Sequence, residues 1–182
     1  MKRPPAIPKR KRIFIGCEGE SEQAYGAFLN NLAEISGVKV HIVTVNLQPA
    51  GDPLVLSQKA VNALRFHERR GGFVAAAIFL DCDRLVDLPD KGRRVKEVLV
   101  QAALTAIWQV PDHEGFLLRH FQGYEDSIIP TGKSFVSLRK EWPTYHKNMA
   151  ATDLQKTLTI EHVRRAEKAS AELKELLKAI GL

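Results

Sequence analysis

Short apolar runs alternate with amphipathic stretches along the first 110 residues of the chain. The runs that have the length and composition of strands lie at 12–17, 38–48, 73–84 and 104–110. The stretches with apolar residues at helical spacing lie at about 21–36, 54–70 and 93–103. Strands that alternate with helices in this way are typical of an α/β layer with right-handed crossovers. We therefore expect a Rossmann-like α/β fold, with a mostly parallel sheet flanked by helices.

Local signals refine these predictions. The run at 73–84 shows no alternation of polar and apolar residues, as expected for a central strand covered by helices on both faces. In the first helix the apolar positions lie at helical spacing, Ser21 or Glu22 can cap the first turn, and Gly37 marks the end. Those apolar positions are Ala24, Phe28, Leu32 and Ile35. Residues 88–92 read as a turn.

The second part of the chain is predicted to be mostly helical. A helical stretch at 113–121 follows Pro111, and a long closing helix is expected over 159–179. We expect one α/β domain over 13–158, a flexible basic leader over 1–12, and a C-terminal helical extension over 159–182. This extension would pack on the sheet or on a second copy of the chain, which leaves a homodimer open.

The net charge of +6 resides in the leader. Six of the 27 Lys and Arg side chains lie within residues 1–12, and the remainder balance the 21 acidic ones. Such a leader is expected to stay unfolded and to be attracted to phosphate, so it is a candidate nucleic-acid-binding arm; a merely solubilising tail is the alternative. The residues of this arm nearest the domain are Lys9, Arg10, Lys11 and Arg12.

The apolar runs and the cysteines indicate the compartment. No run approaches the roughly 20 apolar residues that a membrane-spanning helix needs, and the short run after the leader does not resemble a signal peptide. We therefore expect a cytoplasmic protein without a membrane partner. Cys17 and Cys82 lie in apolar runs and are expected to be unbridged structural thiols.

Acidic residues follow two of the predicted strands. Glu18, Glu20 and Glu22 come after the first strand, and Asp81 and Asp83 end the third. Because the carboxyl ends of parallel strands open on one edge of a sheet, these carboxylates are predicted to meet there. Several anions beside an apolar sheet are unfavourable unless a cation lies among them, and oxygen ligands select Mg²⁺ or Mn²⁺. A capped helix start and an acidic turn are the structural alternative.

These residues resemble a known domain. "IFIGCEGESE" followed by "FLDCDR" is similar to the Toprim domain of topoisomerases, primases and OLD-type nucleases, and the form Glu-Gly-Glu-Ser-Glu is closest to the RloB-like family. The stretch "PDHEGFLLRHF" at 111–121 and the residues Tyr145, Lys147 and Asn148 resemble two further family motifs. The resemblance covers about residues 12–165. Phe116 stands where the family often has Trp, and "WQV" replaces a more usual small polar pair before Pro111.

The resemblance implies functions for particular residues. Glu18 would act as a general acid/base or metal ligand, with Asp81 and Asp83 as metal ligands and Glu22 in a supporting place. It also implies a nuclease or nucleic-acid-processing role in anti-phage or restriction-associated defence. Since the chain lacks a Gly-x-x-x-x-Gly-Lys loop, a separate ATPase is an expected partner.

Three further residues are candidates for the edge of the metal site or for contacts with the substrate. Glu114 lies beside an apolar helical stripe, where a carboxylate needs a metal, an Arg or a structural hydrogen bond. His113 and His120 are two turns apart and cannot hold one metal, so His120 is expected to form a core hydrogen bond or to contact substrate, and zinc is disfavoured. Lys147 belongs to a basic segment with interleaved aromatics, a pattern typical of single-strand binders. That segment contains Lys133, Arg139, Lys140, Trp142 and Tyr145.

The sequence thus predicts an Mg²⁺-dependent nuclease or phosphodiester-processing enzyme that acts on DNA or RNA. A nucleic-acid-binding accessory subunit without catalytic activity is the main alternative. Phosphoryl transfer to a small nucleotide by the same acids is a third candidate.

Overall fold

The computed structural model describes residues 10–49, 51–85 and 88–182. Within them the strands are β1 Lys11–Cys17, β2 Val40–Asn46, β3 Ala75–Asp81 and β4 Thr105–Gln109. The helices of the α/β layer are α1 Glu20–Ile35, α2 Pro53–Glu68, α3 Pro89–Gln101 and α8 Ala171–Ile180. The shorter helical segments are α4 His113–Leu118, α5 Ser134–Glu141, α6 Ala151–Leu154, α7 Ile160–Ala166 and η1 Glu167–Ala169.

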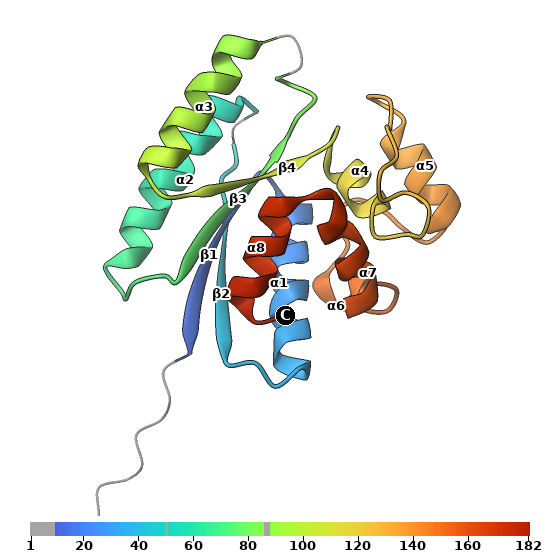
Figure 1. The fold of residues 1–182 in the computed structure, drawn as a ribbon, viewed down its shortest axis with the longest axis horizontal. Helices are drawn as coiled ribbons and strands as arrows, with labels where there is room; N and C mark the ends of the chain where they lie inside the picture. Colours follow the sequence, from blue (N-terminus) through green and yellow to red (C-terminus); the bar gives the residue numbers. More distant parts are fainter. Residues whose placement is uncertain (1–9, 50, 86–87) are drawn as a thin grey trace, which may run out of the picture.

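The strands form one parallel sheet in the order β2-β1-β3-β4. Helices cover both faces of the sheet, with α2 and α3 on one side and α1 and α8 on the other, and α4 to α7 lie beyond α1 (Figure 1). The chain therefore has the Rossmann-like α/β architecture that its sequence predicts. In this register Cys17 pairs with Asn46, and Asp81 pairs with Gln109, so the carboxyl ends of the strands lie along one edge.

Alternation along the strands divides the core into two clusters. Ile13, Ile15 and Phe79 belong to the larger cluster, which also contains buried residues of α1, α4, α7 and α8. Phe14 and Ile78 face the opposite way, into a smaller cluster with α2 and α3. A strand buried on both faces has no polar positions to alternate, which explains the continuous apolar run at 73–80.

The sheet begins slightly earlier than predicted. Lys11 and Arg12 belong to β1 and not to the leader. The Arg12 guanidinium lies 4.3 Å from the centre of the Phe73 ring and donates to the carbonyl of Gly71, so this cation is engaged within the domain. Arg10 is exposed, whereas residues 1–9, with Lys9 and most of the predicted nucleic-acid-binding arm, lie outside the described residues.

Two details of the helix prediction are wrong. The 88–92 segment is not a free turn, because α3 starts at Pro89, a residue favoured in the first turn of a helix. The long closing helix is interrupted, because the Ser170 hydroxyl accepts the Leu173 N–H at 3.1 Å and starts α8 anew. Ile35 is 71% exposed, since it is the last residue of α1 and lies past the buried stripe of that helix.

The C-terminal extension packs on the chain's own sheet. Leu173, Leu176, Leu177 and Ile180 of α8 are buried in the larger core cluster, together with residues of β1, β3 and β4. In the part of the chain that the structure describes, no helix is both long enough and apolar enough to cross a membrane.

The close approach of α4 to the segment after β4 requires Gly115. A Cβ at this position would lie 2.6 Å from the Val110 carbonyl oxygen and 2.7 Å from Pro111 Cδ, and this backbone segment cannot move aside easily. We expect Gly115→Ala to lower the free energy of unfolding by about 1–3 kcal/mol, measured by urea denaturation. Gly92→Ala in α3 is the matched control, because nothing in the described parts of the chain lies within 4 Å of its Cβ and alanine favours a helix. Equal effects of the two substitutions would contradict this account.

Candidate functional site

The first two acids of the candidate site lie where β1 passes into α1. Glu18 follows the last residue of β1 and is half-buried. Glu22, in the first turn of α1, is 5% exposed, and its Oε2 accepts the Gly19 N–H at 3.0 Å. Glu22 therefore caps its own helix, as predicted, but it lies in the interior and not on a solvated helix start. Glu20 is exposed and does not join the cluster.

The aspartates lie at the end of β3, held by the chain that leaves β4. Asp81 is the last residue of β3, and Asp83 lies in the turn that follows. The N–H groups of Cys82 and Asp83 each donate to the Pro111 carbonyl at 3.0 Å, which fixes the turn. Asp83 Oδ1 is buried and has no hydrogen-bond partner among the described residues. An unpaired buried carboxylate oxygen is costly and is expected at a site that binds a cation or a donor.

Gln109 joins the two acidic segments. Its amide hydrogen-bonding pattern is satisfied when the nitrogen donates to Glu22 Oε1 at 3.2 Å and to Asp81 Oδ1 at 2.9 Å. Its oxygen then accepts the N–H of His113 Nδ1 at 2.6 Å. One nitrogen atom therefore lies within hydrogen-bonding distance of both carboxylates, so Glu22 and Asp81 are immediate neighbours. Gln109 can reach Asp81 because the two residues are paired in the register of β3 and β4.

Electrostatic coupling extends across the whole cluster. Burial raises the pKa of Asp81 to about 9, and the charges of Glu18, Glu22, Asp83 and Asp112 add to the shift. Burial also raises the pKa of Glu18, as do Glu22 and Asp83, whereas Arg84 and a backbone hydrogen bond at Asp81 lower it. Glu18, Glu22, Asp81 and Asp83 therefore interact with one another electrostatically, whereas Glu20 does not take part. Without a cation, the cluster relieves this repulsion by keeping a proton on Asp81 at neutral pH.

The two cysteines are unbridged, as predicted. Cys17 is buried in the larger core cluster. Cys82 is half-buried on the α3 side of the sheet, and burial raises its pKa to about 11, with Asp81 and Asp83 adding to the shift and Lys96 opposing it. Both thiols therefore stay protonated and unreactive at neutral pH.

The segment after α5 also meets this edge. Glu114 is buried, and its Oε1 accepts from the Tyr145 hydroxyl at 3.3 Å and pairs with Lys147 Nζ at 3.5 Å. The Ser21 hydroxyl donates to Asn148 Oδ1 at 3.1 Å and accepts the Asn148 N–H at 3.2 Å. The sequence blocks at 18–22, 111–121 and 145–148 therefore lie together. Glu114 obtains the partner that a buried carboxylate requires from Tyr145 and Lys147.

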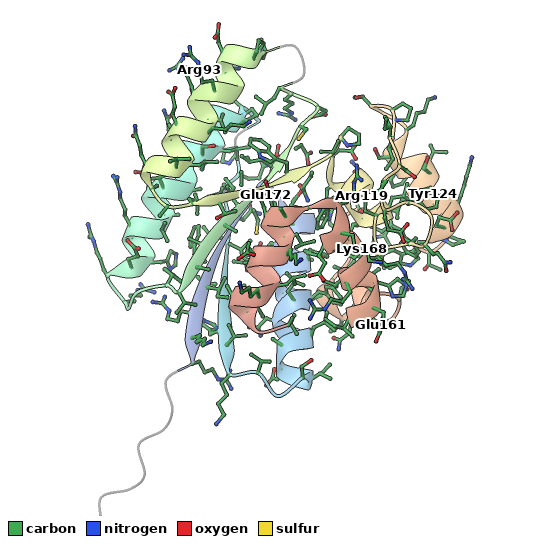
Figure 2. The ribbon with its side chains drawn as sticks, in the orientation of Figure 1. Arg93, Arg119, Tyr124, Glu161, Lys168 and Glu172 are labelled. Atoms are coloured by element: carbon green, nitrogen blue, oxygen red, sulfur yellow. The ribbon has the colours of Figure 1, made fainter. Side chains whose placement is uncertain are left out.

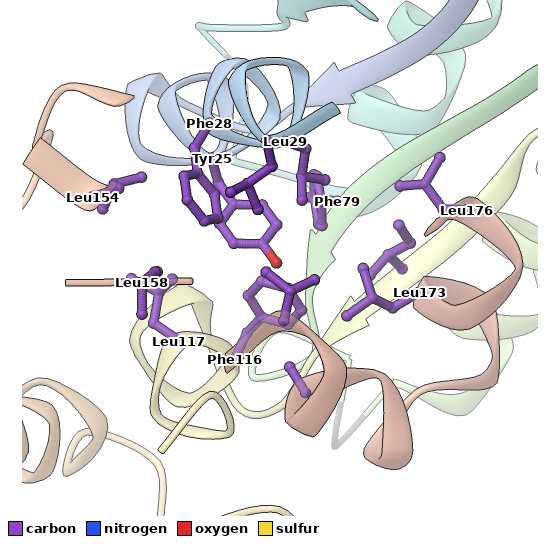
Figure 3. Packing of buried hydrophobic residues seen from close by; sticks show 14 of the residues in the cluster. Tyr25, Phe28, Leu29, Phe79, Phe116, Leu117, Leu154, Leu158, Leu173 and Leu176 are labelled. Atoms are coloured by element: carbon purple, nitrogen blue, oxygen red, sulfur yellow. The ribbon is translucent and has the colours of Figure 1, made fainter. Parts of the chain in front are cut away.

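His120 is a core residue. Its ring is fully buried, Nε2 lies 2.8 Å from the Tyr25 hydroxyl, and Nδ1 lies 3.1 Å from the Leu117 carbonyl. Burial lowers the pKa of His120 to about 3, so the ring is neutral, donating from Nδ1 and accepting from Tyr25. Figure 3 shows Tyr25 in the middle of the larger cluster, with Phe79 and Phe116 close to it. Of the two alternatives for His120, the geometry favours the core hydrogen bond over substrate contact.

Removal of the Tyr25 hydroxyl should destabilise the fold. In Tyr25→Phe, His120 Nε2 would be left buried without its donor, and we expect the free energy of unfolding to fall by about 1–3 kcal/mol. Chemical denaturation at pH 7.5 measures this change. Tyr124→Phe is the control, because Tyr124 donates to Glu141 in an exposed pair. If Tyr25→Phe were as stable as the wild type, the assigned hydrogen bond would be wrong.

The structure does not support the prediction that Trp142 and Tyr145 are exposed stacking residues of the basic segment. Trp142 and Tyr145 are 3% and 1% exposed, and their ring centroids lie 5.4 Å apart. They pack against the core, so they cannot offer stacking faces to nucleobases. Lys133, Arg139 and Lys140 are exposed around α5, but Trp142 and Tyr145 do not lie among them at the surface.

Three residues of this edge were not among the predicted site residues. Gln109 bridges the carboxylates, His113 is buried with its Nδ1 3.5 Å from Glu22 Oε1, and Asp112 caps α4 by accepting the Gly115 N–H at 2.8 Å. The position of Gln109 at the end of the fourth predicted strand was the available signal, because that position lies on the same sheet edge as Asp81.

The carboxylates of the cluster, as the structure describes them, do not converge on a single point where a metal ion could bind. Across residues 10–49, 51–85 and 88–182, no three His, Cys, Asp or Glu side chains are arranged to hold a metal ion as they stand. Glu22 and Asp81 instead share the Gln109 nitrogen. The arrangement is a cluster of coupled oxygen donors around a buried, unpaired carboxylate oxygen of Asp83.

Comparison of the chain with protein-family models, with curated proteins and with solved structures gave no match.

Proposed function

We propose that the protein is a Toprim-type, RloB-like enzyme that uses Mg²⁺ or Mn²⁺ to process phosphodiester bonds in DNA or RNA. The observation that carries this proposal is the electrostatic coupling of Glu18, Glu22, Asp81 and Asp83 at the carboxyl edge of a parallel sheet. Ligands of open α/β sheets bind at this edge. The Toprim resemblance and its defence context belong to the same proposal.

The donor chemistry of the cluster fits a hard divalent cation. All candidate ligands are carboxylates, and one oxygen of Asp83 is buried without a partner. Such a cation would reverse the repulsion that now raises the pKa of Asp81. Glu18, Asp81 and Asp83 would hold it, with Glu22 in support. The Gln109 hydrogen bonds to Glu22 and Asp81 orient these acids before any ligand binds.

The cation would supply charge neutralisation of the phosphate and an acidified water. Glu18 is placed to move a proton, because it is half-buried at this edge, and in the metal-free protein burial and its acidic neighbours raise its pKa. Lys147 is 66% exposed at its side chain and can turn from Glu114 to a substrate phosphate. Glu114 and Tyr145 hold the segment that carries this lysine against the site.

The test is cleavage of single- and double-stranded DNA and RNA by the purified protein, with Mg²⁺, with Mn²⁺ and with EDTA. We expect cleavage with either metal, none with EDTA, and none by the Asp81→Asn, Asp83→Asn double variant. Cleavage by the double variant at the wild-type rate would assign the activity to a contaminant. Binding without cleavage under every condition would favour the accessory-subunit alternative, and turnover of nucleotides alone would favour phosphoryl transfer.

A further inference from the structure

A second feature of the same sheet edge is a largely apolar groove beside the edge strand β4. The groove has a volume of about 870 Å³ and lies on the face that α3 covers. We call it the α3–β4 groove. The lining residues used below are Cys82, Arg93, Lys96, Val100, Trp108 and Val110. Two of them leave much apolar surface uncovered, since Val100 is 78% exposed and Val110 is 43% exposed.

The groove and the acid cluster lie back to back. Strand alternation directs Asp81 and Gln109 to the α1 side of the sheet, and it directs Cys82 and Trp108 to the α3 side. The turn at 81–83 therefore forms part of both. The charges of Asp81 and Asp83 act on the Cys82 thiol, and so does that of Lys96, which lines the groove with it. A chain-like ligand that passes over this turn can occupy both places.

The charges of the groove differ in sign from those of the cluster. Arg93 and Lys96 line it, with Glu97 as the acidic residue among the lining groups. Figure 2 shows Arg93 at the end of α3 that follows the loop from β3. An anionic ligand with flat apolar rings suits a half-buried indole, apolar walls and cations at the rim. The volume is within the usual range for small-molecule sites, about 300–1,000 Å³.

We propose that the α3–β4 groove binds unpaired nucleobases of a single-stranded nucleic acid whose neighbouring phosphate lies at the acid cluster. This inference rests on the proposed function, because that function places a phosphodiester beside the groove. Trp108 stacks on a base, and Arg93 and Lys96 pair with the phosphates. The site therefore selects single strands, since the bases of a duplex are not free to stack on a side chain.

Tryptophan fluorescence tests this directly. The chain has two tryptophans, and Trp142 is 3% exposed in the core, so a base that stacks in the groove should quench Trp108 selectively. We would titrate single-stranded DNA and RNA 12-mers in EDTA, which prevents metal-dependent cleavage, and measure affinity independently by anisotropy of labelled strands. We expect quenching in the wild type, about tenfold weaker binding by Trp108→Leu, and near wild-type affinity without the quenching for Trp108→Phe.

The matched control is Phe66→Leu, which removes an exposed aromatic ring from α2 outside the groove and should bind as the wild type does. The double variant Arg93→Gln, Lys96→Gln should weaken binding and reduce its dependence on salt by roughly one unit of slope for each lost phosphate contact. Thermal unfolding shows whether each variant is folded. If Trp108→Leu does not fold, the comparison of the wild type with Trp108→Phe still tests the groove.

The results of these experiments test the groove assignment separately from the proposed function. Equal affinities of the wild type and Trp108→Leu, or unchanged emission on binding, would overturn the groove assignment even if cleavage is observed. A change of self-association in Trp108→Leu without a change in nucleic-acid affinity would also overturn it, in favour of a protein-docking surface. Stacking in the groove without any metal-dependent cleavage would instead overturn the proposed function and leave the groove as a binding site.

Discussion

Glu18→Gln should reduce metal-dependent cleavage by about 10²–10⁴-fold, the usual effect of removing a positioned acid or base. The substitution keeps the size and hydrogen-bonding ability of the side chain, but it removes a charge from the cluster that also contains Glu22 and Asp83. It also removes a carboxyl whose pKa is raised by burial and by its acidic neighbours. Single-turnover rates with Mg²⁺ at saturating protein measure the loss without interference from product release.

Glu20→Gln provides the matched control for this prediction. Glu20 is two residues away and loses the same charge, but it is exposed and does not belong to the cluster. Its rate should stay within about twofold of the wild type, since exposed substitutions away from a site change little. If both variants lost activity equally, net charge rather than the site would be responsible. If Glu18→Gln cleaved at the wild-type rate, Glu18 would have no catalytic role.

Asp81→Asn should stabilise the metal-free protein at pH 8 by about 1–2 kcal/mol, a common gain when a strained site residue is neutralised. The folded-state pKa of Asp81 is about 9, far above the usual value of 3.8. The contribution of this group to stability is therefore complete at low pH and is lost as the pH rises from about 4 through 9. Asn keeps the acceptor for Gln109 and removes the charge, so the variant should lack this part of the pH dependence.

Urea denaturation in EDTA at pH 5.5 and at pH 8 measures the effect. Asp126→Asn, an exposed aspartate outside the cluster, should leave both values unchanged. Mg²⁺ at about 100 times its dissociation constant should then add about 2.7 kcal/mol to the wild type and nothing to the Asp81→Asn, Asp83→Asn variant. A wild type that is equally stable at both pH values, with or without Mg²⁺, would contradict the coupling of these acids.

The strands were predictable because each signal is local. The predicted runs end at residues 17, 84 and 110, and the observed strands end at Cys17, Asp81 and Gln109; the order of the runs implied a parallel sheet. The proximity of Glu22 to Asp81 followed from the same rule, because it depends only on which edge a strand end reaches. The break at 167–170 was missed because apolar spacing continues across it, and the Ser170 cap is a weak signal beside that spacing.

The finer structure of the site depends on contacts between distant parts of the chain. Gln109 becomes a bridge only when β4 is paired with β3 in the observed register. Trp142 and Tyr145 looked like stacking residues because neighbouring lysines suggested exposure, but packing against the core buried them. The choice between a core and a substrate-contacting His120 likewise depended on whether Tyr25 could reach it from α1. Sequence patterns predict faces of elements, and they do not specify which side chains meet between elements.

The most direct measurement is anomalous diffraction at the manganese edge from crystals soaked in Mn²⁺. We expect an anomalous peak between the carboxylates of Glu18, Asp81 and Asp83, with Glu22 turned towards it. A well-ordered cluster without such a peak, or a peak elsewhere on the molecule with the Glu18 carboxylate directed away from both aspartates, would contradict this expectation.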